Sequence, residues 1–296
     1  MKKTTGYLRL IRPANIVTSI ADILAGIAIS GFFTNFTFNQ ANIFPVLLLC
    51  LSTIGLYGGG IVFNDVFDAE LDKVERPERP IPSGLINISE ASWLGGLLLL
   101  AGIISAALVS YISGILALSI ALAALFYDKY GKHYSFLGPL NMGFCRGLNL
   151  LLGISIIAAA LNEWFFLAAV PVIYIYSITM ISRGEVHGGS RKSLYTAAAL
   201  YLIVLGFILY ISIIEEQLVW TLIFLLFLAW MIFRPLLHAI QEPIGKNIGM
   251  AVKAGVISLI IMDAAWAAAF NSFSVAVIII FLLPVSLWLA KLFAVT

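Results

Sequence analysis

Residues 64–84 read NDVFDAELDKVERPERPIPSG and stand out in a chain that is otherwise strongly apolar. Of its 296 residues, 61% are hydrophobic and 11% are charged, and the mean hydropathy is +1.04. A soluble domain is about 45–50% apolar and about 25% charged. The composition therefore indicates an integral membrane protein, and it raises the question of why three aspartates and two arginines gather in this one segment.

Long apolar runs outside this segment predict ten membrane-spanning helices. A bilayer core needs about 20 apolar residues per helix. On that measure the candidate spans are 14–33, 43–63, 91–110, 112–128, 137–158, 163–181, 194–214, 217–234, 248–270 and 273–291. Because no long polar linker divides them, we expect residues 1–296 to form one domain. The predicted fold class is all-α, a polytopic membrane helical bundle.

The distribution of charge predicts which side of the membrane each loop faces. Cytoplasmic loops carry an excess of Lys and Arg. If the basic N-terminus lies inside, the predicted outer loops hold Glu163, Glu215 and Glu216 but no Lys or Arg. The long polar segments then all lie on the cytoplasmic side: 64–90, 128–136, 182–193 and 235–247. We therefore predict a multi-pass protein of the inner cell membrane whose active-site loops face the cytoplasm.

The acids of the opening segment are spaced for one helical face. If residues 64–72 continue the second span at about 100° per residue, then Asp68, Asp72 and Asp65 lie about 40°, 80° and 100° from Asn64. Hard oxygen ligands that converge in this way suit Mg²⁺, which bridges protein carboxylates to substrate phosphates. A solvated loop has no reason to place its acids in this phase. We therefore predict Mg²⁺ as a cofactor, with these four residues as its ligands.

Basic residues follow the acids directly. Lys73, Arg76 and Arg79 come next, together with prolines that end the helix and stiffen the turn. Arginine side chains match phosphate oxygens with two parallel hydrogen bonds. Carboxylates for a metal beside guanidinium groups for phosphate predict a diphosphate-binding site, in which these three side chains offset the negative charge.

The pattern N-D-x-x-D-x-x-x-D followed by R-P-x-R-P-x-P-S-G resembles the first aspartate-rich motif of the UbiA superfamily of intramembrane prenyltransferases. The earlier segment LRLIRPANIVTSIADILAG also resembles the start of that family's first helix. The resemblance implies a bundle of nine helices around a central cavity, to which the tail at about 272–291 adds a probable tenth. It also implies two aspartate-rich cytoplasmic motifs that bind Mg²⁺ and a prenyl diphosphate. The prenyl group is then transferred to an aromatic or other lipophilic acceptor.

The second motif departs from the family pattern. Residues 176–193, YSITMISRGEVHGGSRKS, hold its place but contain no aspartate. Three interpretations stay open. Glu185, together with His187, holds a second metal ion; or Arg183 and Arg191 replace that ion as counter-charges for phosphate; or the protein no longer ionises a diphosphate.

Two further groups of residues are candidates for the site. The Tyr-x-x-x-Lys pattern of the family is matched imperfectly by Tyr127 with Lys132, which is one residue too far, or with Lys129, which is two residues too near. The resemblance implies that Tyr127 faces the diphosphate and that Lys132 helps to bind it. Arg146 and Asn149 lie deep in the fifth predicted span, where an arginine is costly and marks a functional site by default. Arg146 can pair with Asp22 at the cavity, and a purely structural pair is an equally good interpretation.

Arg146, Asn149 and the segment SRGEVHGG also resemble one branch of the superfamily, the UbiA-like EboC proteins, which are associated with bacterial gene clusters for secondary metabolites. Two functions remain open. The first is a Mg²⁺-dependent prenyltransferase in which Asp65, Asp68, Asp72 and Tyr127 are catalytic. The second is a non-catalytic membrane carrier or assembly factor for a polyprenyl phosphate or a hydrophobic metabolite. The expected partners are a prenyl diphosphate, a hydrophobic acceptor and membrane lipids, and no nucleic acid.

Overall fold

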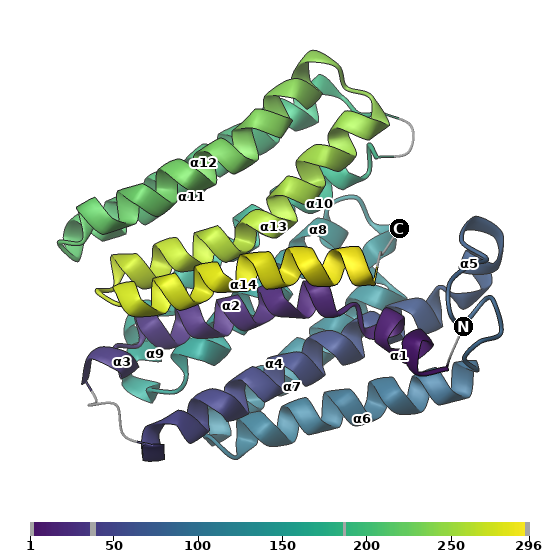
Figure 1. Ribbon diagram of the computed structural model, residues 1–296, viewed down its shortest axis with the longest axis horizontal. Coiled ribbons are helices and arrows are strands. Elements are labelled where there is room, and N and C mark those ends of the chain that lie inside the picture. The colour runs from purple at the N-terminus through teal and green to yellow at the C-terminus, as the bar shows by residue number, and fades with distance from the viewer. Residues whose placement is uncertain (1–2, 36–39, 186–187, 294–296) are drawn as a thin grey trace.

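A computed structural model describes residues 3–35, 40–185 and 188–293, and all regular secondary structure in these ranges is helical (Figure 1). The α-helices are α1 (Lys3–Ile11), α2 (Pro13–Ile29), α3 (Phe32–Asn35), α4 (Gln40–Phe67), α5 (Ala69–Glu75), α6 (Ile88–Ala107), α7 (Tyr111–Lys129), α8 (Leu137–Ile154), α9 (Ala158–Trp164), α10 (Ala169–Ser182), α11 (Arg191–Ile214), α12 (Leu218–Gln241), α13 (Gly245–Ala269) and α14 (Phe273–Leu292). Short 3₁₀ turns, η1 (Gly131–His133) and η2 (Phe165–Ala168), lie between them. The predicted all-α membrane bundle is confirmed.

In the described ranges, eight helical segments are long and apolar enough to cross a membrane. They are Ile43–Phe67, Ile88–Ala107, Tyr111–Lys129, Ala158–Ser182, Arg191–Ile214, Leu218–Gln241, Gly245–Ala269 and Phe273–Leu292. Helices α1 and α2 meet at a bend of 41° and add a ninth if they are counted as one span. The predicted fifth span is present as helix α8, but it is not in this set because Asn141, Arg146 and Asn149 make it polar.

Glycines bring neighbouring helices unusually close. A methyl group on Gly26 of α2 would lie 2.4 Å from the carbonyl oxygen of Leu150 in α8, and one on Gly153 would lie 2.5 Å from that of Ile23. Helices α4 and α6 meet in the same way at Gly55. Small residues permit such close backbone contact within membranes. These contacts set the spacing of the helices that surround the site.

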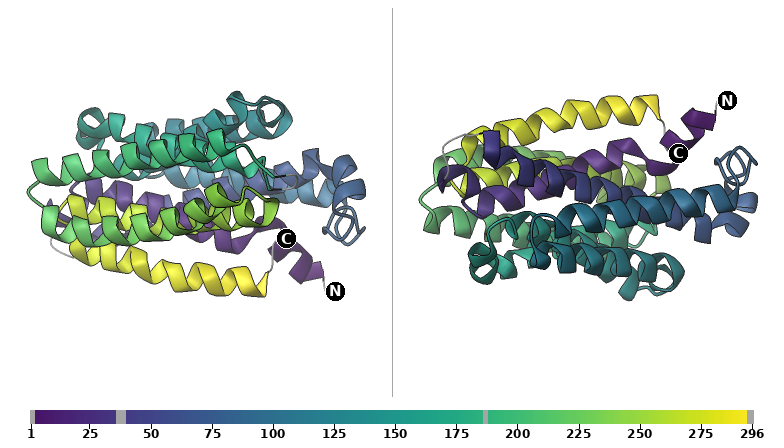
Figure 2. Two further views of the ribbon diagram at one scale, coloured as in Figure 1. Left: turned by 90° about the horizontal axis from the view of Figure 1, so that it is seen from above. Right: turned by 90° about the horizontal axis from the view of Figure 1, so that it is seen from below.

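The C-terminal helix α14 lies along one outer face of the bundle, beside α2 and α13 (Figures 1 and 2). The hydroxyl of Ser286 in α14 donates a hydrogen bond of 3.0 Å to the backbone oxygen of Ala14 in α2. The additional helix expected at about 272–291 is therefore present, and a buried polar contact attaches it to the first membrane helix.

The predicted polar segments meet at one end of the bundle. The side chain of Arg183 donates to the backbone oxygen of Tyr134 at 2.8 Å, which joins the segment after α10 to the one after η1. The backbone nitrogen of Gly189 donates to the backbone oxygen of Pro243 at 3.1 Å, which joins it to the turn between α12 and α13. An ion pair between Lys132 and Asp68 adds the segment that follows α4.

Candidate functional site

The helix expected over residues 64–72 is interrupted at Asp68, so the expectation of one continuous helix is wrong. Helix α4 ends at Phe67, Asp68 has φ −89° and ψ 2°, and α5 begins at Ala69. The bend lets Ala69 pack in a small apolar cluster with Leu10 and Ile86, among others. Burial of this apolar surface favours the bend over a straight helix.

Asp65 and Asp72 nevertheless converge on one cation. Nη1 of Arg79 lies 3.2 Å from Oδ1 of Asp65 and 2.6 Å from Oδ2 of Asp72. Nη2 of Arg12 donates to the same oxygen of Asp65 at 2.6 Å. Both carboxylates are buried, with 4% and 3% of the residue exposed. The two acids therefore form one cluster with two arginines, one of them from the joint between α1 and α2.

The other two predicted metal ligands lie beside this cluster. Asp68 pairs with the ammonium group of Lys132 from η1. Nδ2 of Asn64 donates to Oδ1 of Asp128 at 2.9 Å. Asp128 is buried at the end of α7, next to Tyr127, and the ion pairs of the described residues leave it without a cation.

Asp128 and Arg12 are site residues that the sequence analysis missed. Asp128 could have been found as an acid at the end of an apolar span, in the segment FYDKYGKH that already contained Tyr127. Arg12 precedes Pro13 in the segment that resembles the first helix of the family, but its partner is distant in sequence. The contact between Arg12 and Asp65 depends on how α2 packs on α4.

The carboxylate oxygens of the cluster suit a divalent cation, although the aspartates that carry them are paired with arginine and lysine side chains. Among the described residues, no three His, Cys, Asp or Glu side chains converge as a ready metal site. A single nitrogen of Arg79, however, contacts carboxylates of both Asp65 and Asp72. A cation at that position therefore reaches both, and oxygen donors of this kind are those that Mg²⁺ prefers.

The remaining predicted site residues have partners outside the cluster or lie outside the described residues. Lys73 pairs with Glu70 at 2.7 Å on the exposed side of α5, so the structure does not bring it to the acids. Partial burial raises the pKa of Glu185, and the positive charge of Arg76 opposes that rise. His187 lies outside the described residues. Arg183 is held by a backbone oxygen of the segment after η1.

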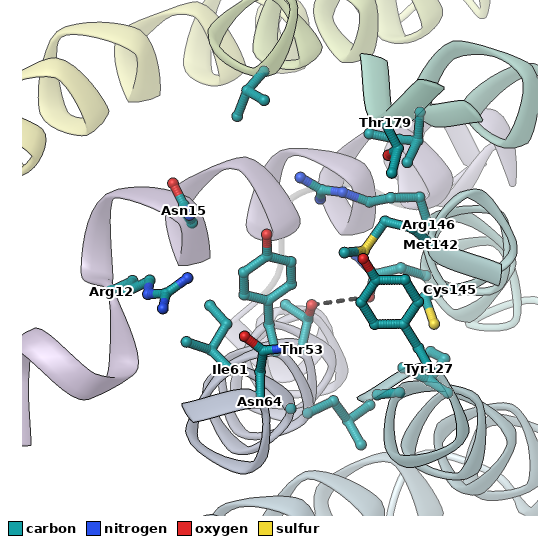
Figure 3. A pocket seen from close by; sticks show the side chains of 18 of the residues that line it. Arg12, Asn15, Thr53, Ile61, Asn64, Tyr127, Met142, Cys145, Arg146 and Thr179 are labelled. Atoms are coloured by element: carbon teal, nitrogen blue, oxygen red, sulfur yellow. Dashed lines mark hydrogen bonds between the residues drawn. The ribbon is translucent and has the colours of Figure 1, made fainter. Parts of the chain in front are cut away.

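A cavity of about 320 Å³ opens beside the cluster (Figure 3). Helices α4, α7, α8, α10 and α13 line it, together with the start of α2. Figure 3 shows Arg12 and Tyr127 on opposite sides of this cavity, with Asn64 projected between them. Apolar side chains such as Ile120 and Leu259 form much of its wall. The cavity therefore joins a charged mouth to an apolar interior.

Arg146 and Asn149 form a polar network at the inner wall of the cavity. The guanidinium of Arg146 donates to Asp22 and to Thr18, so the pair considered in the sequence analysis is present. Nδ2 of Asn149 donates to Oδ2 of Asp22 at 2.9 Å, and Thr53 donates to Oδ1 of Asn149 at 2.8 Å. These bonds connect α2, α4 and α8 within the membrane region.

Comparison with known proteins identifies sequence relatives of this chain. A sequence profile of the UbiA prenyltransferase family matches residues 23–247. The digeranylgeranylglyceryl phosphate synthase of Sulfurisphaera tokodaii is 32% identical over 176 residues, which cover 59% of this chain and 60% of that protein. The synthase of the same name from Methanosarcina mazei is 35% identical over 179 residues, which cover 56% and 61%. The chain thus spans about 60% of the length of these curated relatives.

Solved structures show the same fold. A digeranylgeranylglyceryl phosphate synthase structure aligns with a TM-score of 0.68 and 25% identity, covering 92% of this chain and all of that one. The UbiA homolog from Archaeoglobus fulgidus bound to DMAPP and Mg²⁺ aligns with a TM-score of 0.59 and 16% identity, covering 86% and 98%.

Proposed function

The chain belongs to the UbiA prenyltransferase family, and we propose that it transfers a prenyl group from an allylic diphosphate to a lipophilic acceptor. The observation that carries this proposal is the position of the acidic cluster. Asp65 and Asp72 share one guanidinium nitrogen, and residues beside them line a cavity whose interior is largely apolar. A charged headgroup fits the mouth and a hydrocarbon chain fits the interior.

The acids are proposed to hold Mg²⁺ on the diphosphate. Asn64, Asp65, Asp68 and Asp72 would supply oxygen ligands, and Glu185 would add one from the second segment. Bound Mg²⁺ would neutralise the diphosphate and stabilise pyrophosphate as the leaving group. The homolog described with DMAPP and Mg²⁺ supports this assignment by analogy of fold.

The basic residues are proposed to bind the diphosphate oxygens. Arg79 and Lys132 already lie at the cluster, and the charge of Arg76 acts on Glu185. Arg183 contributes to the same electrostatic environment, since its charge acts on the Tyr127 phenol. Positioned charges of this kind stabilise the negative charge that develops as the C–O bond breaks.

The cavity wall is proposed to protect the reacting carbon. Ile120 and Leu259 exclude water from the allylic cation, and the ring of Tyr127 can attract it. The ring of Tyr57 already has the guanidinium of Arg146 at 5.3 Å, so we assign the cation to Tyr127 instead. The acceptor then attacks the allylic carbon and loses a proton.

The proposal also concerns the chemical class of the acceptor. We propose a lipophilic acceptor, aromatic or otherwise, that reaches the cavity from the membrane. The curated relatives reported above carry the name digeranylgeranylglyceryl phosphate synthase and not EboC. Membership of the EboC branch, with its link to secondary metabolism, therefore stays a prediction from Arg146, Asn149 and the second segment.

The cellular location is likewise proposed from charge. The predicted outer loops contain acids but no Lys or Arg, which supports an inner-membrane protein whose site faces the cytoplasm. The clustering of the four polar segments at one end of the bundle is consistent with that arrangement.

The test is metal-dependent release of pyrophosphate. The full chain in lipid nanodiscs is incubated with labelled geranyl, farnesyl or geranylgeranyl diphosphate and a host lipid extract. We expect release that EDTA abolishes, together with a labelled lipid product. Asp65→Asn with Asp68→Asn should remove it. Glu70→Gln is the matched control, because Glu70 lies in the same segment but its side chain is 80% exposed.

Binding without release would overturn the enzyme proposal. If the wild-type chain binds these diphosphates in a Mg²⁺-dependent manner but releases no pyrophosphate with any of them, the carrier function is favoured. The missing aspartates of residues 176–193 would then be the structural reason.

A further inference from the structure

Arg12 has an unusual backbone for a residue other than glycine. Its φ of 47° and ψ of 69° lie in the left-handed region, and it precedes Pro13. This conformation is unfavourable for a residue that has a side chain. It forms the joint at which α1 and α2 meet with a bend of 41°. Such strain persists where the surrounding contacts hold it in place, and it often marks a functional position.

The side chain of Arg12 lies between the acidic cluster and the cavity. Its Nη2 contacts Oδ1 of Asp65 at 2.6 Å, and the residue also lines the cavity. Among the described residues, Asp65 is the one acid that pairs with Arg12. Arg79 binds the same Asp65 oxygen but also has Asp72 at 2.6 Å. A divalent cation that engages Asp65 and Asp72 would take both partners from Arg79 and the one partner from Arg12, and of these two arginines Arg12 is the one that lines the cavity.

Resting on the proposed function, we propose that Arg12 exchanges Asp65 for a diphosphate oxygen when a divalent cation binds Asp65. A divalent cation on Oδ1 of Asp65 would lie close to the guanidinium that contacts the same oxygen at 2.6 Å, and repulsion between the two positive charges would weaken the contact of Arg12.

The new partner of Arg12 would be a diphosphate bound in the cavity. The guanidinium already borders it, and the planar fork of arginine suits phosphate oxygens. The other end of α1 has its own attachment, since Lys3 pairs with Glu90 at 2.7 Å and Tyr7 contacts the same carboxylate. The start of α1 is therefore tied to α6 independently of Arg12.

Two binding measurements on the full chain in nanodiscs test the exchange. The first is the dissociation constant for Mn²⁺ alone, followed by the EPR signal of free Mn²⁺. The second is the dissociation constant for geranyl S-thiolodiphosphate, an unreactive allylic diphosphate analogue, in the presence of Mg²⁺. Arg12→Gln should tighten Mn²⁺ binding several-fold because a competing cation is gone. It should weaken analogue binding by about 10- to 100-fold, since a charged hydrogen bond is lost.

Two further variants control for folding and position. Arg12→Gly should reproduce both changes, and it tolerates the positive φ. Lys3→Gln removes the surface pair of α1 and should change neither constant. If Arg12→Gln and Arg12→Gly leave both constants unchanged, or weaken both together, the exchange is refuted. If the wild-type chain binds neither Mn²⁺ nor the analogue, the proposed function itself fails.

Discussion

Asn64 and Asp128, which are 64 positions apart in the sequence, are joined by a hydrogen bond of 2.9 Å from Nδ2 to Oδ1 at the mouth of the cavity. Asn64 belongs to the segment whose acids define the predicted motif, whereas Asp128 ends α7 and was not expected at the site. The bond orients the amide of Asn64 and leaves its carbonyl oxygen available. We therefore infer that Asp128 positions the proposed metal ligand.

Replacing Asp128 should reduce activity through Asn64. Asp128→Ala removes the acceptor of a partly buried hydrogen bond, which costs about 1–3 kcal/mol, so kcat/KM for pyrophosphate release should fall by about tenfold. Asp128→Asn can still accept the bond through its amide oxygen and should retain more activity. Steady-state kinetics across Mg²⁺ concentrations provide the measurement. Wild-type kinetics in Asp128→Ala would remove Asp128 from the site.

Replacing Arg79 should destabilise the fold in a way that a divalent cation corrects. Arg79→Ala leaves Asp65 and Asp72 buried without their shared cation, and breaking a buried pair of this kind costs about 3–5 kcal/mol. We expect a lower Tm in a thiol-reactive fluorescence assay, with partial recovery on addition of Mg²⁺. Recovery in MgCl₂ that is matched by an equal ionic strength of NaCl would contradict a specific metal position.

Glu185 should discriminate between the interpretations of the second segment. If it is a metal ligand, Glu185→Gln should weaken Mn²⁺ binding, whereas Glu185→Asp should retain part of it. If Arg183 supplies the counter-charge instead, Arg183→Gln should weaken binding of the diphosphate analogue and leave Mn²⁺ binding alone. The two dissociation constants, measured on the same preparations, separate these outcomes.

The network around Arg146 should contribute mainly to stability. Asp22→Asn leaves the buried guanidinium without its carboxylate, and we expect a loss of about 3–5 kcal/mol. Arg146→Leu combined with Asp22→Leu removes both charges and should be less destabilising than Asp22→Asn alone. Unfolding in a graded series of denaturing detergent provides the comparison. If the effects of Asp22→Leu and Arg146→Leu, each measured alone, add up to the effect of the double variant, a coupled pair is contradicted.

The glycine contact between α2 and α8 should tolerate no side chain. Gly26→Ala places a methyl group 2.4 Å from a backbone oxygen of α8, and we expect a loss of about 1–3 kcal/mol. Gly206→Ala in α11 is the matched control, because nothing lies within 4 Å of the added methyl group. There the change should be neutral or stabilising by up to about 1 kcal/mol. Equal Tm values for the two variants would overturn this interpretation.

The sequence by itself determined the class of the fold and the place of the acidic motif. Apolar runs of membrane length are local, because a buried span needs its own backbone hydrogen bonds and apolar side chains. The structure has a helix at each predicted span, including the additional one at Phe273–Leu292. The spacing of Asp65 and Asp72 is equally local, and Arg79 holds both.

Only the tertiary structure decided which partners these residues have. The bend at Asp68 depends on an apolar cluster that includes Leu10. Lys73 pairs with the exposed Glu70 instead of the buried aspartates. Arg12 reaches Asp65 across 53 positions, and Asn64 reaches Asp128 across 64. Helical periodicity carries no information about such distances, because they are set by how closely α2, α4, α7 and α8 approach one another.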